Sequence, residues 1–273
     1  MGIWMKPSIV ENLFGFIGRK SNQVLKGIND ASKLINSMFY WSFISPFKGR
    51  SIRIKATVSE MVKVGYNAVP IVSVIALFIG IILALQAAYQ LKRVGAMIYV
   101  ANLVGVSLTR ELAPILTAII VAGRSGSAFA AEIGSMKAAE EVDALVTMGI
   151  NPIRYLVVPK LVAMIVMLPV LTLFADFIGI LGGFLLAITQ LEIHPYSYYQ
   201  QTINALVIKD IVTGLIKALA FGIVITIVGA YQGFKVVGGA EEVGRRTTAS
   251  VVTSIFLVIV FDLFFTTLFY IFA

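Results

Sequence analysis

Residues 109–152 have the sequence TRELAPILTAIIVAGRSGSAFAAEIGSMKAAEEVDALVTMGINP, and this stretch decides how the chain is built. It begins with the charged pair Arg110-Glu111 inside an otherwise apolar segment, passes through a run of small residues, and ends in an acidic, amphipathic helix. A charged side chain at membrane depth is costly and usually marks function. The final part is too charged to stay in a bilayer, so the stretch is expected to lead from a membrane span into a helix outside the membrane.

The composition predicts an all-α integral membrane protein. Of the 273 residues, 59% are hydrophobic and only 13% are charged. A helix crosses the roughly 30 Å of bilayer hydrocarbon with about 20 apolar residues, and apolar runs of that length recur along the chain. No separate globular domain fits beside them. The absence of cysteine excludes disulfides and thiolate metal sites.

The apolar runs predict five spans and two parts of the chain. Residues 1–66 form a basic N-terminal elbow segment, in which apolar side chains at helical spacing predict an interfacial helix in the headgroup plane. Residues 67–273 form the membrane domain, with a loop or short interfacial helix from Gln190 to Asp210. The expected spans are about 67–90, 96–123, 155–189, 211–234 and 248–272, and the amphipathic helix covers about 128–148.

The distribution of basic residues predicts the orientation. The side that holds the N-terminus carries ten Lys and Arg residues before the first span, four between the second and third spans and three between the fourth and fifth. The opposite side carries three. Because positive charge concentrates on the cytoplasmic side, the N-terminus and the amphipathic helix are expected in the cytoplasm and the C-terminus outside. This topology explains the net charge of +8 without a nucleic-acid partner.

Arg110 and Glu111 lie near the middle of the second expected span. Adjacent helical residues point about 100° apart, so each is expected to need its own partner or a wet cavity. Pro114 cannot donate to the carbonyl of residue 110 and crowds it, which predicts a kink at the charged pair. These three residues are candidates for a substrate path or coupling joint, and the alternative is a structural pair that fixes helix packing. Further intramembrane charges, expected to snorkel or to pair with neighbouring helices, are Lys217, Asp176 and Asp262.

The small residues after the second span predict a hinge. Gly123 and Gly126 permit close helix approach and let the chain turn at the membrane surface. In the helix that follows, charged residues alternate with apolar ones, which is typical of a helix that docks in a partner's groove. Its acidity argues against the alternative, a helix lying on anionic lipid without a partner. The charged residues of the expected docking helix are Glu132, Lys137, Glu140, Glu141 and Asp143.

Several kinds of chemistry find no support in the sequence. No phosphate loop of the form G-x-x-x-x-G-K-[ST] occurs, so the chain is not expected to bind ATP by that route. The sole histidine, His194, has no Cys, His or Asp cluster around it, and no metal site is predicted. No nucleophile–base set can be assembled. The chain is therefore expected to be neither an enzyme nor the holder of a cofactor.

Three blocks of sequence carry a resemblance to a known family. They are TRELAPILTA, VAGRSGSAFAAEIGSMK and EEVDALVTMGINPIRYLVVPK, all within residues 109–160. Over roughly 55–273 the chain resembles the MlaE (YrbE-type) permease family. These proteins are the membrane subunits of ABC systems that move phospholipids or other lipids to or from the bacterial outer membrane. The resemblance implies an elbow helix followed by five spans in the bacterial inner membrane, and a role in outer-membrane lipid asymmetry.

The same resemblance implies partners and roles. The permease would work as a homodimer with a cytoplasmic ABC ATPase, which uses the ATP, beneath a hexameric ring of periplasmic MCE-domain proteins. A small STAS-domain protein is an optional further partner. The helix around Ala130–Met148 resembles the family's coupling helix, and Glu111 matches the glutamate of its R-E-L motif in the dimer's central helices. The phospholipid cavity would lie between the two copies, lined by the second and fifth spans and opening outward.

Two other functions remain open on the residues alone. A secondary, proton-coupled transporter would use Glu111 as a proton relay, would need no ATPase and would tolerate loss of the acidic helix. The two halves of the chain show no sequence repeat, so the inverted-repeat plan of many such transporters has no support. A membrane scaffold without transport would tolerate apolar residues at Arg110 and Glu111.

Overall fold

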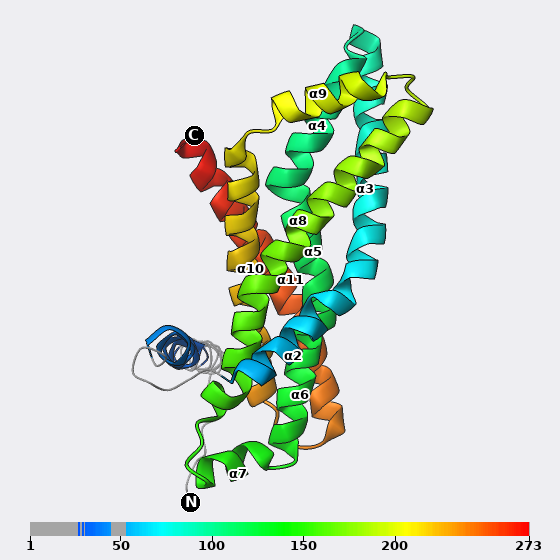
Figure 1. The fold of residues 1–273 in the computed structure, drawn as a ribbon. Coiled ribbons are helices and arrows are strands. Elements are labelled where there is room, and N and C mark those ends of the chain that lie inside the picture. The colour runs from blue at the N-terminus through cyan, green and yellow to red at the C-terminus, as the bar shows by residue number, and fades with distance from the viewer. Residues whose placement is uncertain (1–26, 28, 30, 45–52, 273) are drawn as a thin grey trace, which may run out of the picture.

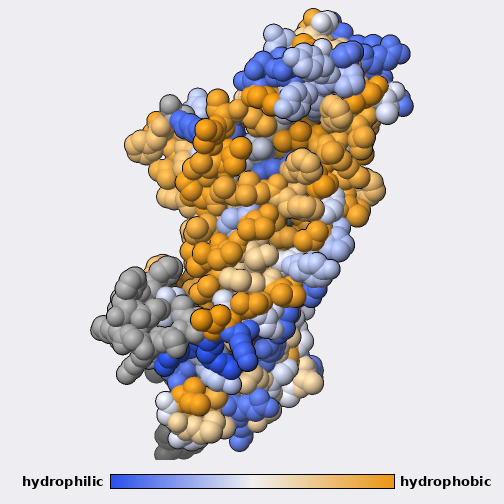
Figure 2. All heavy atoms as spheres, viewed as in Figure 1, coloured by the Kyte–Doolittle hydropathy of each residue, from blue (hydrophilic) through white to orange (hydrophobic). Residues whose placement is uncertain are grey.

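The computed structural model describes residues 27, 29, 31–44 and 53–272, and among these residues there are helices and connections but no strand. Within that part of the chain, five helical segments are long and apolar enough to cross a membrane. They run along the long axis of the molecule (Figure 1). Figure 2 shows hydrophobic residues along the middle and hydrophilic residues gathered at both ends. The predicted all-α, five-span membrane class is confirmed. The segments are Ile54–Val94, Met97–Ala138, Ile153–Thr189, Ile208–Phe234 and Ala240–Ile271.

The described part of the elbow segment is amphipathic. Residues 31–39 are helical and continue into the π-helical turn η1 (Tyr40–Ile44). Leu34 and Met38 are buried, whereas Phe39 is about half exposed. One side of this helix therefore rests on the protein, and its position in the headgroup plane stays a prediction. The more N-terminal members of the predicted apolar stripe, Val24, Leu25 and Ile28, lie outside the described residues.

The first and third spans pack closely together. The first consists of α2 (Ile54–Val64), the 3-10 turn η3 (Tyr66–Ala68) and α3 (Val69–Leu91). The third consists of the π-helical turn η8 (Ile153–Val157) and α8 (Val158–Thr189), which continues through Pro169. A β-carbon on Gly80 would lie 1.9 Å from the carbonyl oxygen of Gly179. Small residues therefore let the two backbones touch.

The second segment is helical from end to end. The 3-10 turn η4 (Lys92–Val94) leads to it, and it runs through η5 (Met97–Tyr99), α4 (Val100–Ser107), η6 (Leu108–Leu112), α5 (Ala113–Val121), η7 (Ala122–Gly126) and α6 (Ser127–Ala138). Its two interruptions, η6 and η7, are π-helical turns rather than breaks. The chain turns only at Glu140, whose φ is 60°, before the short helix α7 (Glu141–Thr147).

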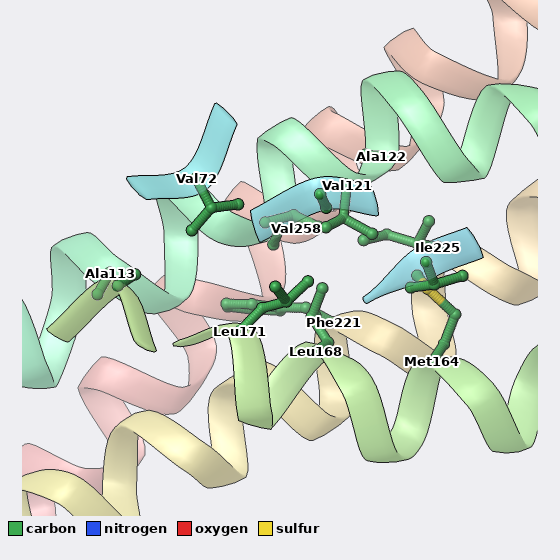
Figure 3. Close-up of a cluster of buried hydrophobic side chains, with 14 of the residues drawn as sticks. Val72, Ala113, Val121, Ala122, Met164, Leu168, Leu171, Phe221, Ile225 and Val258 are labelled. Atoms are coloured by element: carbon green, nitrogen blue, oxygen red, sulfur yellow. The ribbon is translucent and has the colours of Figure 1, made fainter. Parts of the chain in front are cut away.

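The last elements complete the bundle. The loop or short interfacial helix expected between the third and fourth spans is the helix α9 (Pro195–Ala205), and α10 (Ile208–Phe234) and α11 (Ala240–Ile271) follow it. Figure 1 places α9 and α7 at opposite ends of the molecule. Between them, the largest buried core gathers side chains from α3, α5, α8, α10 and α11 (Figure 3). It includes Val72, Val121, Leu168, Phe221 and Val258.

Candidate functional site

The charges predicted within the membrane form one ionic cluster. Lys217, on α10, has a side chain only 1% exposed and forms ion pairs with Glu111 on η6 and, at 3.0 Å, with Asp262 on α11. Its Nζ donates to the Thr266 hydroxyl 2.7 Å away, and that hydroxyl lies 3.2 Å from both carboxylate oxygens of Glu111. One ammonium thus joins three helical segments. Such a buried charge is tolerated only with its partners and hydrogen bonds in place.

The local backbone explains why Lys217 reaches Glu111. A β-carbon on Gly214 would lie 2.2 Å from the carbonyl oxygen of Thr109, so a glycine is needed for α10 to lie against η6. Lys217 follows Gly214 by three residues and therefore shares its face of the helix. Because the side chain points into this contact, the expectation that Lys217 snorkels is wrong. Pairing of Asp262 with a neighbouring helix is confirmed.

Arg110 has a different partner from Glu111. Its Nε lies 3.6 Å from Oδ1 of Asp210, at the start of α10. The other carboxylate oxygen of Asp210 accepts a hydrogen bond from the backbone N–H of Val207. The prediction of separate partners for the two adjacent charges is therefore confirmed. Asp176 is buried on α8, but no ion pair of its carboxylate occurs among the described residues, so the pairing expected for it is not seen there.

The disturbance predicted at Pro114 is a π-helical turn. The backbone N–H of Ala113 bonds to the carbonyl of Leu108, which is the wider π spacing, and α5 begins directly afterwards. Pro114 is the second residue of α5, and because it has no backbone N–H, one hydrogen bond of the continuous helix is missing directly after the π turn. The π turn places Arg110 and Glu111 together on a widened stretch of helix. Such turns occur often at functional sites.

A second ionic cluster lies near the α7 end. Lys160, the third residue of α8, has a side chain 3% exposed and pairs with Glu60 of α2 at 3.2 Å and Glu132 of α6 at 2.7 Å. Its Nζ also lies 4.9 Å from the centre of the Phe129 ring. Glu132, predicted on a free docking face, is therefore engaged by Lys160. The cluster fixes α6 to the beginnings of the first and third spans.

The predicted docking helix is two helices in the structure. Expected as one helix over 128–148, it ends as α6 at Ala138 and resumes as α7 at Glu141. Lys137 spans the break by bonding both carboxylate oxygens of Asp143, at 2.7 and 2.8 Å. Val142 and Leu145 are buried in a core with Leu34 and Leu156, which favours the turn over a straight continuation. The exposed surface of α7 and its flanks carries Glu140, Glu141, Val146 and Met148.

The structure also changes the expectation for the predicted hinge. Gly123 and Gly126 lie in η7, and the helix continues through them without turning. A β-carbon on Gly126 would lie 2.8 Å from Cγ2 of Ile225, so this glycine allows close approach of α10. A β-carbon on Gly123 would meet nothing within 4 Å. Close helix approach is therefore confirmed for Gly126, and a turn at the membrane surface is not seen.

Sequence reasoning missed three contributors to the cluster around Glu111. The sequence pattern indicates neither Thr266 nor the link between Gly214 and Lys217, and it predicts that Lys217 snorkels. One signal was present: Asp262 and Thr266 are four residues apart and so share one face of a helix. Which helix lies opposite that face depends on packing between segments that are far apart in the chain.

These features define a class: a multi-pass membrane protein with an ionic cluster among its spans and a separate polar end. The comparison with protein families narrows the class, since the profile of the family Permease MlaE matches residues 57–268. The chain belongs to the MlaE permease family. The resemblance carried by residues 109–160 is thereby confirmed.

Three relatives align in sequence with most of this chain. A probable ABC transporter permease protein of Rickettsia prowazekii is 39% identical over 236 residues, covering 86% of this chain and 91% of the relative. A probable ABC transporter permease protein of Synechocystis sp. is 39% identical over 222 residues, covering 81% and 84%. The chloroplastic protein TRIGALACTOSYLDIACYLGLYCEROL 1 of Arabidopsis thaliana is 32% identical over 223 residues, covering 82% and 63%. The chain is thus an ABC permease subunit, a class that works with a partner ATPase and has no ATPase site of its own.

Proposed function

We propose that this permease moves phospholipid or a related lipid between the bacterial inner membrane and periplasmic MCE-domain carriers, for outer-membrane lipid homeostasis. It acts as a homodimer, with its N-terminus in the cytoplasm and its C-terminus in the periplasm. A cytoplasmic ABC ATPase, with or without a STAS-domain protein, supplies the energy. One relative is named after a galactolipid, trigalactosyldiacylglycerol, which supports lipid as the class of cargo.

The observation that carries the proposal is the position of the ionic cluster beside an uncovered apolar helix. The side chain of Glu111 is 35% exposed, so the cluster opens to one side of the protomer. On α11, which supplies Asp262 and Thr266, only 11% of the most apolar stretch is buried. A second copy over this face would enclose a cavity with apolar walls and a few charged groups, which suits a lipid with a polar headgroup.

The α7 end supplies the second half of the proposal. Its exposed surface combines acidic Glu140 and Glu141 with apolar Val146 and Met148. An acidic helix with exposed apolar side chains fits a groove on a protein better than it fits anionic lipid. We therefore assign α7 and the adjoining end of α6 as the contact with the ATPase.

Glu111→Gln tests the proposed lipid path. The substitution keeps the side chain's shape but removes its charge beside Lys217, so we expect ATP-dependent transfer of fluorescent phospholipid in proteoliposomes to fall at least about tenfold, the effect of roughly 1.4 kcal/mol. The ATPase should still co-purify. Glu192→Gln, an exposed carboxylate between α8 and α9, is the matched control. Transfer at the wild-type rate by Glu111→Gln would refute the assignment, and transfer driven by a pH gradient without ATP would favour the proton-coupled alternative.

A further inference from the structure

A cationic cavity lies at the α7 end, separate from both ionic clusters. It has a volume of about 610 Å³, is open on one side and is lined by residues of η1, of η8, from just before α2 and from the chain between α7 and η8. Arg53 and Arg154 line it together with Trp41 and Tyr155. No acidic side chain is among the described residues that line it. The cavity is therefore suited to an anion.

Aromatic rings hold the two guanidinium groups at the cavity wall. The Arg53 guanidinium lies 3.8 Å from the centre of the Tyr155 ring, and the Arg154 guanidinium lies 5.3 Å from the Trp41 ring. Arg53 Nη1 also donates to the carbonyl oxygen of Tyr155, 3.4 Å away. A guanidinium has several N–H donors in one plane, so a single bond and a stacked face leave Arg53 able to bind an anion edge-on.

The cavity lies where two spans begin. Arg53 immediately precedes Ile54, the first residue of the first membrane-crossing segment, and Arg154 is the second residue of the third segment. Trp41 belongs to the amphipathic elbow segment and is itself a residue type that gathers at membrane–water interfaces. With the elbow segment in the headgroup plane, as the sequence predicts, both arginines beside Trp41 would face the phosphates of the lipid headgroups.

We propose that this cavity binds the phosphate of an anionic phospholipid in the leaflet at the α7 end, which is the cytoplasmic leaflet in the proposed orientation. Arginine pairs bind phosphate oxygens through parallel N–H bonds, and basic pockets beside spans select anionic headgroups. The interfacial position predicted for the elbow segment, which contributes Trp41, favours a lipid over an acidic protein surface. Binding here needs only membrane insertion, so the proposal stands apart from the cargo and direction of transport.

Trp41 provides a direct probe of occupancy. The chain has two tryptophans, so Trp4→Phe leaves Trp41 as the single emitter. Brominated phosphatidylglycerol and brominated phosphatidylcholine, which quench tryptophan only on contact, are titrated separately into phosphatidylcholine nanodiscs over the same range of mole fractions. We expect phosphatidylglycerol to quench at a several-fold lower mole fraction. Arg53→Gln with Arg154→Gln should remove this preference, and either single substitution should lower it.

A matched arginine exists elsewhere in the chain. Arg93 also lies over a tyrosine, 4.8 Å from the Tyr89 ring centre, and its Nη2 bonds to the Tyr89 hydroxyl at 2.7 Å, but it does not line the cavity. Arg93→Gln should leave the preference unchanged. Arg53→Lys with Arg154→Lys should keep only part of it, because lysine lacks the paired donors. This double lysine variant also serves if the glutamine variant does not elute as a single species.

Three results would overturn the proposal. Equal quenching by the two lipids in the Trp4→Phe protein would show no selectivity for an anionic headgroup. Loss of the preference in Arg93→Gln would show a general effect of surface charge. An undiminished preference for phosphatidylglycerol in the double glutamine variant, accompanied by loss of the co-purifying ATPase, would assign the cavity to a protein contact instead.

Discussion

At the scale of single residues, Lys217 is the most constrained charge in the described part of the chain. It is buried between Glu111 and Asp262, and its position follows from the contact of Gly214 with Thr109. Part of this could be predicted from the sequence. Adjacent charges on a helix diverge, so separate partners for Arg110 and Glu111 followed from helix geometry alone. The identity of the partners did not, because Lys217 and Glu111 are 106 residues apart and meet only through packing.

Lys217→Met is expected to destabilise the protein by about 3–5 kcal/mol, because it leaves two carboxylates near each other without their cation. Thermal unfolding of the purified protein in mild detergent, followed by circular dichroism, measures the loss. Lys209→Met, at an exposed position on the same helix, should change little. Equal unfolding temperatures for Lys217→Met and wild type would show that the ionic cluster does not hold these spans together.

Adding a methyl group is expected to have opposite effects on stability at two glycines. Gly80→Ala places a β-carbon against the Gly179 backbone, which cannot retreat as a flexible side chain does, so we expect a loss of roughly 1–3 kcal/mol or more. Gly123→Ala fills open space within a helix and should stabilise by about 0.5–1 kcal/mol. The same unfolding measurement compares them. Transport by Gly123→Ala at the wild-type rate is also expected, and its loss would restore the hinge interpretation.

At the scale of elements, apolar length predicts the spans well and the connections poorly. Each span is identified by an apolar run, and that property needs no knowledge of neighbours. The run of small residues after the second span predicted a turn, but small residues serve equally well where helices touch, as Gly126 touches Ile225. No glycine or proline next to Glu140 in the sequence indicates the turn there. It depends on burial of Val142 and Leu145 against other elements.

The proposed ATPase contact is tested on α7. Glu141→Lys reverses a charge on an exposed position and should reduce recovery of the ATPase at least about tenfold if the acidic side chain faces a basic groove. Quantitative co-purification in mild detergent is the measurement. Glu192→Lys, exposed between α8 and α9, makes the same charge change far from α7 and should leave recovery unchanged. Equal recovery with both variants would move the docking surface away from α7.

At the scale of the whole molecule, α11 is the span with the least buried surface, and it carries an exposed apolar stripe. Side chains at positions that share one helical face are exposed by about half or more: Val252, Phe256, Ile259 and Leu263. The family and the class of fold could be inferred from sequence, because long apolar runs and the motif over residues 109–160 are local. The assembly could not, since apolar surface facing lipid and apolar surface facing a second copy look the same in sequence.

The proposed homodimer is tested by single cysteines. The natural chain has no cysteine, so Phe256→Cys gives one reactive site on the exposed face of α11. A bifunctional maleimide added to membranes should then link two chains, detected as a doubled mass on denaturing gels. Val74→Cys, at a similarly exposed position on α3, should remain a single chain. Equal cross-linking at both positions would indicate random collision rather than a defined interface.

The unbroken helix of the second segment has a mechanical consequence. Its 42 residues extend for about 63 Å at the usual rise, which exceeds the thickness of the hydrocarbon layer. Because the helix continues through both π turns without a break, the azimuth of α6 fixes the azimuth of Glu111. A rotation of α6 at its junction with α7 would therefore turn the helix by the same angle at Glu111. The Glu111–Lys217 contact would then respond to rotation of the whole helix about its axis and not to bending at η7.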